Sequence, residues 1–417
     1  MPTTERVSLD ALLKGAREAS RGLARADRDA ALLAMADAIE RHAADILEAN
    51  AQDVAGERRR GTSAALVDRL TLDVERLHGI AQGCRQVAAL PDPLGRVLDG
   101  WRLANGLDVR KVTAPFGVIA LIYESRPNVT VDASALAVKA GSAMVLRGSS
   151  NALSSNRALV TVMRAGLASA GLPEDVVQLV DSADRALVTE LLEARGRVDL
   201  VIPRGGAGLI RHVVENARVP VVETGVGNCH VYVHATADLA MAESIVYNAK
   251  VQRPGVCNAA ETLLVDAAVA DAFLPAALAK LRAAGVELRG CERARAVVAD
   301  VAPADASDWE TEYLDLTLAV KVVDGLDDAL AHIARYGTQH SEAIVTRDLV
   351  SAERFRSEVD AAAVYVNAST RFTDGFAFGF GAEIGISTQK LHARGPMGLA
   401  EIVTYKYLVD GDGQVRD

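Results

Sequence analysis

The chain has 417 residues, of which 50% are hydrophobic and 4% aromatic, so we expect a two-domain globular protein with cores built mainly from Ala, Val and Leu. Its net charge of -10 argues against nucleic-acid binding, which needs a basic face, and its most apolar strip, 117–123, is far shorter than the roughly 18 residues of a membrane span. The start of the chain lacks the apolar stretch of a secretory signal and the four cysteines show no C-x-x-C pair, so we expect a cytoplasmic protein with reduced thiols.

Helices are predicted through roughly the first ninety residues. Apolar side chains such as Leu32, Ala36 and Ile39 recur there at helical spacing with charged residues between them. Pro91 ends this pattern, because proline interrupts a helix.

A small β arm is predicted from two separate segments. Residues 94–112 contain an alternating pattern around Asn105-Gly106, a pair that supplies the positive-φ turn of a hairpin, and 401–410 alternate again. We expect the final strand to pair with the hairpin or with another subunit, so the arm is a candidate for oligomerisation.

Short apolar runs alternate with helical patterns between residues 115 and 225. Strands that are apolar throughout are buried on both faces, and helical crossovers between them predict a parallel, doubly wound sheet of the kind that binds nucleotides. The expected strands are 117–123, 143–147, 176–180, 200–204 and 219–223, with helices beginning near Val131, Ser155, Asp184 and Gly208.

A second α/β set follows after a boundary near Gly225. Its expected strands are 230–233, 261–265, 318–323, 343–346 and 364–367, with helices beginning near Asp238, Asp266, Leu326 and Asp348.

Cys257 is a candidate nucleophile. It lies in the segment 252–258, a Pro/Gly-turned loop between a predicted helix and a predicted strand, where a side chain can point into a cleft. A thiolate is the strongest nucleophile available near neutral pH. A buried structural cysteine is the alternative, and it is the preferred interpretation of Cys84, Cys229 and Cys291.

Glu223 lies 34 residues before Cys257, separated from it by one strand and one helix. This arrangement resembles the aldehyde dehydrogenase superfamily, whose Glu-x-Gly-Gly motif and catalytic cysteine have the same spacing. Three further segments, 123–128, 323–344 and 366–372, resemble those of the γ-glutamyl phosphate reductases within that superfamily. The resemblance covers almost the whole chain.

The resemblance implies an aldehyde-dehydrogenase-like α/β fold. Residues 1–93 and 113–223 would form an NADP-binding domain, to which 382–400 return. Residues 224–381 would form the catalytic domain, with 94–112 and 401–410 as the oligomerisation arm.

The implied reaction is the NADPH-dependent reduction of L-glutamyl 5-phosphate to L-glutamate 5-semialdehyde and phosphate, the second step of proline biosynthesis from glutamate. Cys257 would expel the phosphate and form a thioester that accepts hydride. The protein would be a homo-oligomer, and a glutamate 5-kinase that delivers the acyl phosphate is a candidate partner. No metal is expected, because His230 and His234 lack further ligands.

Two alternatives remain open at this stage. A hydrolytic NAD(P)-dependent aldehyde dehydrogenase would use Glu223 as the base that activates water. A non-catalytic binding protein would share the fold without the activity.

The oxyanion of the tetrahedral intermediate needs hydrogen-bond donors, and the backbone N–H of Cys257 is the first candidate. The superfamily's Pro-Trp-Asn-Phe-Pro motif supplies an asparagine, whereas this chain has Tyr123 to Asn128 there. Asn128 is a candidate replacement or a helix cap. Glu223 is either a catalytic group or a structural carboxylate.

The cofactor residues follow from the superfamily plan. The turn after the second strand contains no acidic residue, whereas NAD-specific sites usually place one there, so NADPH is the expected cofactor. Glu312 corresponds to the glutamate that holds the nicotinamide ribose. The full candidate set is Arg147, Gly148, Ser149, Ser150, Gly205, Gly206 and Glu312.

The substrate carries a phosphate and a carboxylate, so cationic side chains should line its pocket. Arg126, Arg253 and Arg371 lie in the motif segments, and Asn367 lies in the same segment as Arg371. These four residues are the candidate substrate contacts, and exposed loop arginines are the alternative.

Overall fold

The computed structural model describes residues 8–416, apart from the side chain of Ala65, and its chain divides into two compact units. Unit 1 comprises Met1–Glu223, Gly379–Gly385 and Met397–Asp417, and unit 2 comprises Thr224–Phe378 and Ile386–Pro396. The segment 382–400, expected to return to the first domain, is therefore divided between the units.

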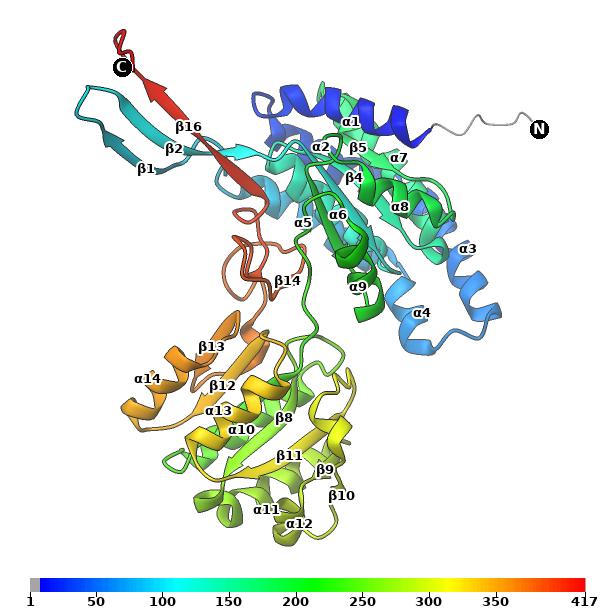
Figure 1. The fold of residues 1–417 in the computed structure, drawn as a ribbon. Coiled ribbons are helices and arrows are strands. Elements are labelled where there is room, and N and C mark those ends of the chain that lie inside the picture. Colours follow the sequence, from blue (N-terminus) through cyan, green and yellow to red (C-terminus); the bar gives the residue numbers. More distant parts are fainter. Residues whose placement is uncertain (1–7, 417) are drawn as a thin grey trace. The chain divides into compact units, whose positions relative to one another are not determined.

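Unit 1 contains a parallel four-stranded sheet in the order β5-β4-β3-β6 (Figure 1). Every residue of β3 is buried, and its face with Val118, Ala120 and Ile122 is covered by three helices, α1 (Leu9–Leu23), α8 (Ala186–Glu193) and α9 (Ala207–Asn216). The strands are β3 (Val118–Tyr123), β4 (Ala143–Gly148), β5 (Val177–Leu179) and β6 (Leu200–Arg204).

Helices fill the segment before the arm, as predicted, and four more lie among the strands of unit 1. They are α1 (Leu9–Leu23), α2 (Arg28–Arg41), α3 (Ala43–Arg59), α4 (Ala64–Leu70), α5 (Val74–Ala89), α6 (Pro127–Lys139), α7 (Leu153–Ser169), α8 (Ala186–Glu193) and α9 (Ala207–Asn216), with short 3-10 turns at Ser150–Ala152 and Glu174–Val176.

The predicted strand at 219–223 is wrong, because only an isolated bridge joins Val221 to Val201. Val201 donates to the carbonyl of Pro220 and accepts from the N–H of Val222. The next donor in this ladder would be residue 203, and Pro203 has no N–H. Pairing with β6 therefore stops after one residue.

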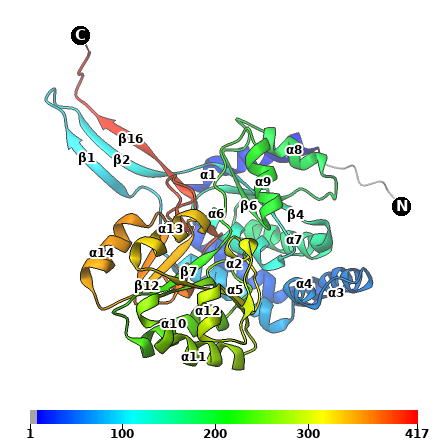
Figure 2. The same ribbon diagram turned by 60° about the horizontal axis from the view of Figure 1, so that its bottom comes forward.

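The arm is a three-stranded antiparallel sheet in the order β1-β2-β16, and its strands are drawn in cyan and red in Figure 2. Gly106 takes the expected positive φ, at 91°, in the turn between β1 (Val97–Arg102) and β2 (Asp108–Pro115). Strand β16 (Val403–Asp410) pairs with β2 over its whole length. Of the two partners expected for the final strand, the structure shows the hairpin.

Unit 2 contains a parallel seven-stranded sheet in the order β10-β9-β11-β8-β7-β12-β13. Its strands are β7 (Cys229–Val233), β8 (Ala260–Asp266), β9 (Glu287–Gly290), β10 (Ala302–Pro303), β11 (Thr317–Val323), β12 (Ser341–Val345) and β13 (Ala363–Val366). Its helices are α10 (Leu239–Val251), α11 (Ala267–Ala283), α12 (Glu292–Val297), α13 (Leu326–Tyr336) and α14 (Leu349–Glu358), with 3-10 turns at Ala306–Trp309 and Thr370–Phe372 and a short pair β14 (Ile386–Ser387) and β15 (Gly395–Pro396).

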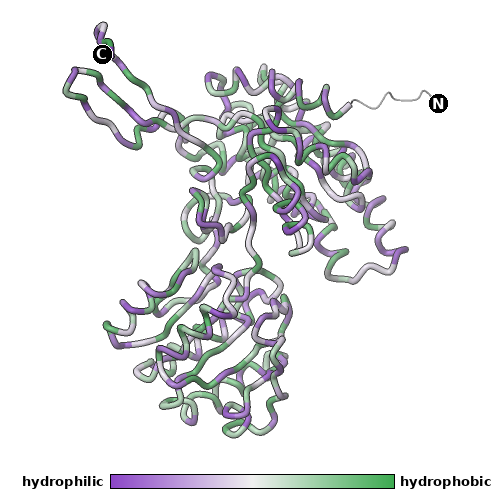
Figure 3. The backbone as a smooth tube through the Cα atoms, viewed as in Figure 1, coloured by the Kyte–Doolittle hydropathy of each residue, from purple (hydrophilic) through white to green (hydrophobic). Residues whose placement is uncertain are grey.

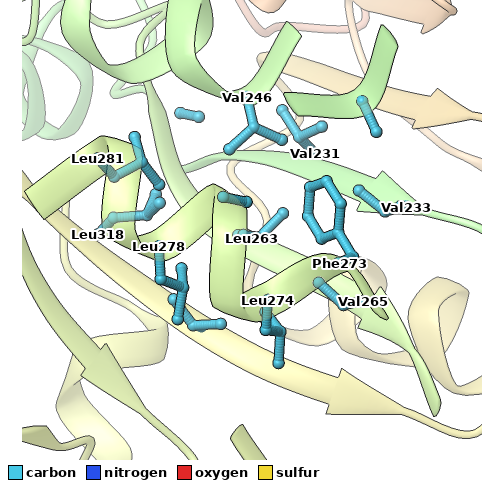
Figure 4. Packing of buried hydrophobic residues seen from close by; sticks show 14 of the residues in the cluster. Val231, Val233, Val246, Leu263, Val265, Phe273, Leu274, Leu278, Leu281 and Leu318 are labelled. Carbon is cyan, nitrogen blue, oxygen red and sulfur yellow. The ribbon is translucent and has the colours of Figure 1, made fainter. Parts of the chain in front are cut away.

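Helices cover both faces of the unit 2 sheet. Leu263 and Val265 of β8 join one core with residues of α10 and α11, among them Phe273 (Figure 4), whereas Leu264 joins another core that includes Phe355 of α14. Hydrophobic residues are concentrated on the sheet strands in Figure 3. Both sheets are thus of the predicted parallel, doubly wound α/β class.

No helix within residues 8–416 is long and apolar enough to cross a membrane.

Candidate active site

The strand order of unit 1 reverses between β3 and β6: β4 and β5 continue on one side of β3, and the chain then crosses to form β6 on the other. In an open parallel sheet, ligands bind beyond the carboxyl ends of the strands at such a point. The predicted cofactor residues at the ends of β4 and β6 lie on this edge of the sheet.

A carboxylate from the chain itself occupies the start of α9. Glu124 follows β3, and its Oε2 accepts a hydrogen bond of 2.9 Å from the N–H of Gly206, the N-cap of α9. A Cβ atom on Gly205 would lie 2.7 Å from Cδ of Glu124, so the backbone must be bare for this approach. Helix N-termini attract anions, and here the anion is Glu124.

Arg147, next to the end of β4, is buried rather than a surface arginine. Its guanidinium donates to the carbonyls of Gly148 and Asp184, and burial, followed by the charge of Arg185, lowers its pKa. Gly148 has no room for a side chain, because a Cβ there would collide with Asn156.

Ser149 belongs to a polar cluster with Ser125 and Asn151. Oγ of Ser125 donates to Oδ1 of Asn151 over 2.9 Å, and Ser149 donates to the same oxygen. Ser150 begins the 3-10 turn that follows. Asn151 is also hydrogen-bonded to the buried carboxylate of Glu57, so the cluster contacts one acidic side chain from α3.

The structure places Asn128 within α6, where Arg126 is the N-cap residue. Its side chain is exposed and its amide donates to Oδ2 of Asp132 over 3.1 Å. Asn128 therefore does not cap the helix. Glu223 is partly buried and is the last residue of the first segment of unit 1.

Cys257 lies in unit 2, three residues before β8 and partly buried. The amino ends of the parallel strands β7 and β8 share one edge of the sheet. The carbonyl oxygen of Cys257 accepts a hydrogen bond of 3.2 Å from Sγ of Cys229, the first residue of β7. Gly227 also approaches the main chain here, since a Cβ on it would lie 2.7 Å from Cα of Cys257.

Asn258 fastens the Cys257 loop to the segment around Arg371. The buried amide of Asn258 donates to the carbonyl of Thr373 over 2.8 Å, and Oγ1 of Thr370 donates to the carbonyl of Asn258 over 2.8 Å. Two loops far apart in sequence are held together by these bonds.

Two cations lie near Cys257. Arg371 is partly buried and its Nε donates to Oε1 of Gln252 over 2.9 Å. Burial lowers the pKa of Arg371, the positive charge of Arg253 lowers it further, and an anion at Cys257 would act in the opposite direction. The structure thus brings together three of the predicted site residues, Cys257, Arg253 and Arg371.

Glu312 also joins this group, because its Oε1 accepts a hydrogen bond of 2.7 Å from the N–H of Gly227. Burial raises the pKa of Glu312. Asn367 does not join it. Asn367 has a φ of 57°, and its side chain makes two hydrogen bonds of 2.9 Å with the backbone of Thr346, at the carboxyl end of β12.

Sequence reasoning did not assign roles to Cys229 and Asn258. Both are buried, and both hold the main chain around Cys257. The sequence shows that Asn258 follows Cys257 and that Cys229 lies at the start of a predicted strand. It does not show the pairing of β7 with β8, which brings Cys229 close to Cys257. Within residues 8–416, no three His, Cys, Asp or Glu side chains form a cluster suited to a metal.

Comparison with known proteins gives the following matches. The model of the aldehyde dehydrogenase family matches residues 1–293. A γ-glutamyl phosphate reductase of Moorella thermoacetica is 58% identical over 415 residues, which are 98% of this chain and 99% of that protein.

Solved structures agree. The crystal structure of γ-glutamyl phosphate reductase from Thermotoga maritima is 50% identical, covers 99% of this chain and 100% of its own, and gives a TM-score of 0.96. An engineered glycolyl-CoA reductase with bound NADP+ is 18% identical, with 96% of each chain covered and a TM-score of 0.67, a likeness of fold alone.

Proposed function

Because this chain belongs to the aldehyde dehydrogenase family and, within it, to the γ-glutamyl phosphate reductases, we propose that Cys257 is the nucleophile of its reaction. The enzyme is an oxidoreductase that reduces L-glutamyl 5-phosphate to L-glutamate 5-semialdehyde and phosphate in the biosynthesis of proline. It uses a nicotinamide cofactor.

The role of Cys257 is supported by one observation: hydrogen bonds fix the loop that contains Cys257, and Arg253 and Arg371 lie near it. The thiolate attacks the carbonyl carbon of the acyl phosphate, the bond from that carbon to the phosphate oxygen breaks, and phosphate leaves. A thioester remains on Cys257. NADPH, when bound, supplies the hydride that reduces this thioester. The resulting hemithioacetal then releases the aldehyde and restores the thiolate.

The residues of unit 1 fit NADPH in two respects. The turn 147–151 itself contains no acidic residue that would repel a 2′-phosphate, and Arg147 lies within it. Glu124 marks the start of α9 as an anion site. We propose that the diphosphate of the cofactor takes the place of the Glu124 carboxylate at Gly205 and Gly206.

Glu312 is proposed to hold a ribose hydroxyl, with Gly227 fixing its carboxylate. The anionic groups of the substrate are proposed to bind Arg253 and Arg371, and Arg126 is the third candidate.

The N–H of Cys257 is the proposed oxyanion donor, because the amide of Asn128 is hydrogen-bonded to Asp132 within its own helix. Glu223 is proposed as a structural carboxylate, since a water-activating base would hydrolyse the thioester.

The arm supports a homo-oligomer. Large apolar side chains on its two outer strands, β1 and β16, are exposed by 43–58%, and a contiguous exposed apolar patch marks an interaction surface. These residues are Val97, Leu98, Trp101, Tyr405, Tyr407 and Val409.

A glutamate 5-kinase is proposed to deliver the labile acyl phosphate. The cytoplasm is the proposed location, in keeping with four free cysteines.

The reverse reaction tests this function. Purified protein, glutamate semialdehyde and NADP+ are followed by NADPH absorbance with and without phosphate, for the wild type and Cys257→Ser. Phosphate-dependent NADPH formation that disappears in the variant supports the proposal. Phosphate-independent turnover would instead favour the hydrolytic aldehyde dehydrogenase with Glu223 as base.

A further inference from the structure

The carbonyl group of Cys257 is held from the side of β7. Cys229 is completely buried at the start of that strand, and its Sγ lies 3.2 Å from the carbonyl oxygen of Cys257. Gly227, two residues earlier, packs against the same peptide group. The carbonyl of Cys257 is therefore contacted by the thiol of Cys229, a hydrogen-bond donor, and by Gly227, which has no side chain.

Cys229 is a donor because its thiol keeps its proton. Burial raises its pKa well above the ordinary value, and the nearby carboxylates of Glu342 and Glu261 raise it further. His340 lies on the other side, with Nδ1 3.7 Å from the sulfur and 2.9 Å from Oγ of Ser341. Burial lowers the pKa of His340 to about 4, so its imidazole is too weak a base to deprotonate the Cys229 thiol, whose own pKa is raised.

Three hydroxyl groups, those of Ser341, Tyr365 and Thr373, extend the hydrogen-bond network from His340. Oγ of Ser341 lies 2.6 Å from Oγ1 of Thr373, and the hydroxyl of Tyr365 lies 2.7 Å from the same atom. Thr373 also accepts, through its carbonyl, the amide of Asn258. The residue after Cys257 is thus tied to the network that holds Cys229.

We propose that Cys229 is a positioning residue for the reaction, whose S–H···O hydrogen bond to the carbonyl of Cys257 fixes the position of Cα of Cys257 and thereby of the nucleophilic side chain. This inference rests on the proposed role of Cys257. Cα of Cys257 is part of the planar 257–258 peptide, so a shift of that peptide would move the side chain as well, and the thiol would meet the acyl carbon in a less favourable position. The Cys229 thiol acts through the main chain and does not touch the substrate.

The test compares Cys229→Ala and Cys229→Ser with a matched control, Cys84→Ala, which removes an equally buried thiol from α5 of unit 1. We expect Cys229→Ala to lower kcat of the phosphate-dependent reverse reaction by about tenfold, the value of one lost hydrogen bond, with the KM for NADP+ unchanged. Cys229→Ser keeps an O–H donor and should retain activity within about threefold of the wild type.

A second readout needs no turnover. Alkylation of Cys257 by iodoacetamide, located by peptide mass spectrometry, should slow by about tenfold in Cys229→Ala and not in Cys84→Ala. Wild-type kcat and alkylation rate in Cys229→Ala would overturn the inference, as would an equal loss in Cys229→Ser. Should Cys229→Ala fail to fold, Cys229→Ser decides: near wild-type kcat supports the donor role, and loss of kcat in the folded protein overturns it. Failure of the proposed function would appear separately, as a wild type without phosphate-dependent turnover.

Discussion

Gly227→Ala should disable the enzyme through one added methyl group. A Cβ at this position would lie 2.7 Å from Cα of Cys257 and nearer still to its carbonyl carbon and oxygen, whereas real Cβ atoms essentially never approach a heavy atom within 3.0 Å. The neighbours are main-chain atoms, which cannot turn away as a flexible side chain does. One of the two loops must therefore move by about 1 Å or more.

The cost falls on both catalysis and folding. Overpacking of this kind costs about 1–3 kcal/mol of unfolding free energy, whereas a displacement of about 1 Å at a reacting group costs about a hundredfold in rate. We expect kcat of the reverse reaction to fall by about a hundredfold. The N–H of Gly227 also binds Glu312, so the KM for NADP+ should rise as well.

The matched control is Gly79→Ala in α5, where an added Cβ meets nothing within 4 Å. It should stabilise the helix by about 0.5–1 kcal/mol and leave kcat unchanged. The assay combines kcat, urea unfolding and the rate at which iodoacetamide alkylates Cys257. A Gly227→Ala enzyme with wild-type kcat and alkylation rate would refute the reasoning, because the nucleophile loop would then tolerate the displacement.

Three further outcomes are expected. Glu124→Gln removes the internal charge at α9 and should lower the Kd for NADPH by about threefold in a fluorescence titration, with the exposed Glu190→Gln as control; an unchanged Kd would contradict displacement of Glu124. The pKa of His340 is lowered by burial from 6.5 to about 4, so its contribution to stability is complete above pH 6.5 and is lost as pH falls towards 4. Between pH 7 and pH 4 the wild type should therefore lose about 3 kcal/mol more unfolding free energy than His340→Asn, and equal losses would show that His340 is not buried as a neutral group. Arg371→Ala should raise the KM for phosphate or for glutamate semialdehyde by about tenfold, and wild-type values for both would remove Arg371 from the substrate site.

Apolar runs sufficed to predict both sheets, because a strand buried on two faces needs hydrophobic residues throughout. The exceptions have local causes. The run 219–223 looks like the other strands, but its neighbour has Pro203 where a donor is needed. Strands β9 and β10 were not predicted, because β10 has only two residues and β9 only four, of which Glu287 and Arg289 are charged.

Contacts between distant segments were beyond sequence patterns. Cys229 was rightly predicted to be buried, yet its bond to Cys257 depends on the register in which Cys229 pairs with Ala260. Asn367 shares a motif segment with Arg371, but its positive φ turns it towards Thr346. Spacing along the chain identified the segment and not the direction of each side chain.

The glycines after Glu223 are required by packing, independently of any chemical role of Glu223. The superfamily pattern is Glu-x-Gly-Gly, whereas this chain reads Glu223-Thr224-Gly225-Val226-Gly227. A Cβ on Gly225 would lie 2.8 Å from Oγ1 of Thr388, and one on Gly227 would meet Cys257. Each glycine is therefore required by a close approach inside unit 2, whatever Glu223 does. Packing around Thr388 and Cys257 thus explains the glycine spacing of this chain, and that spacing does not depend on a catalytic role of Glu223.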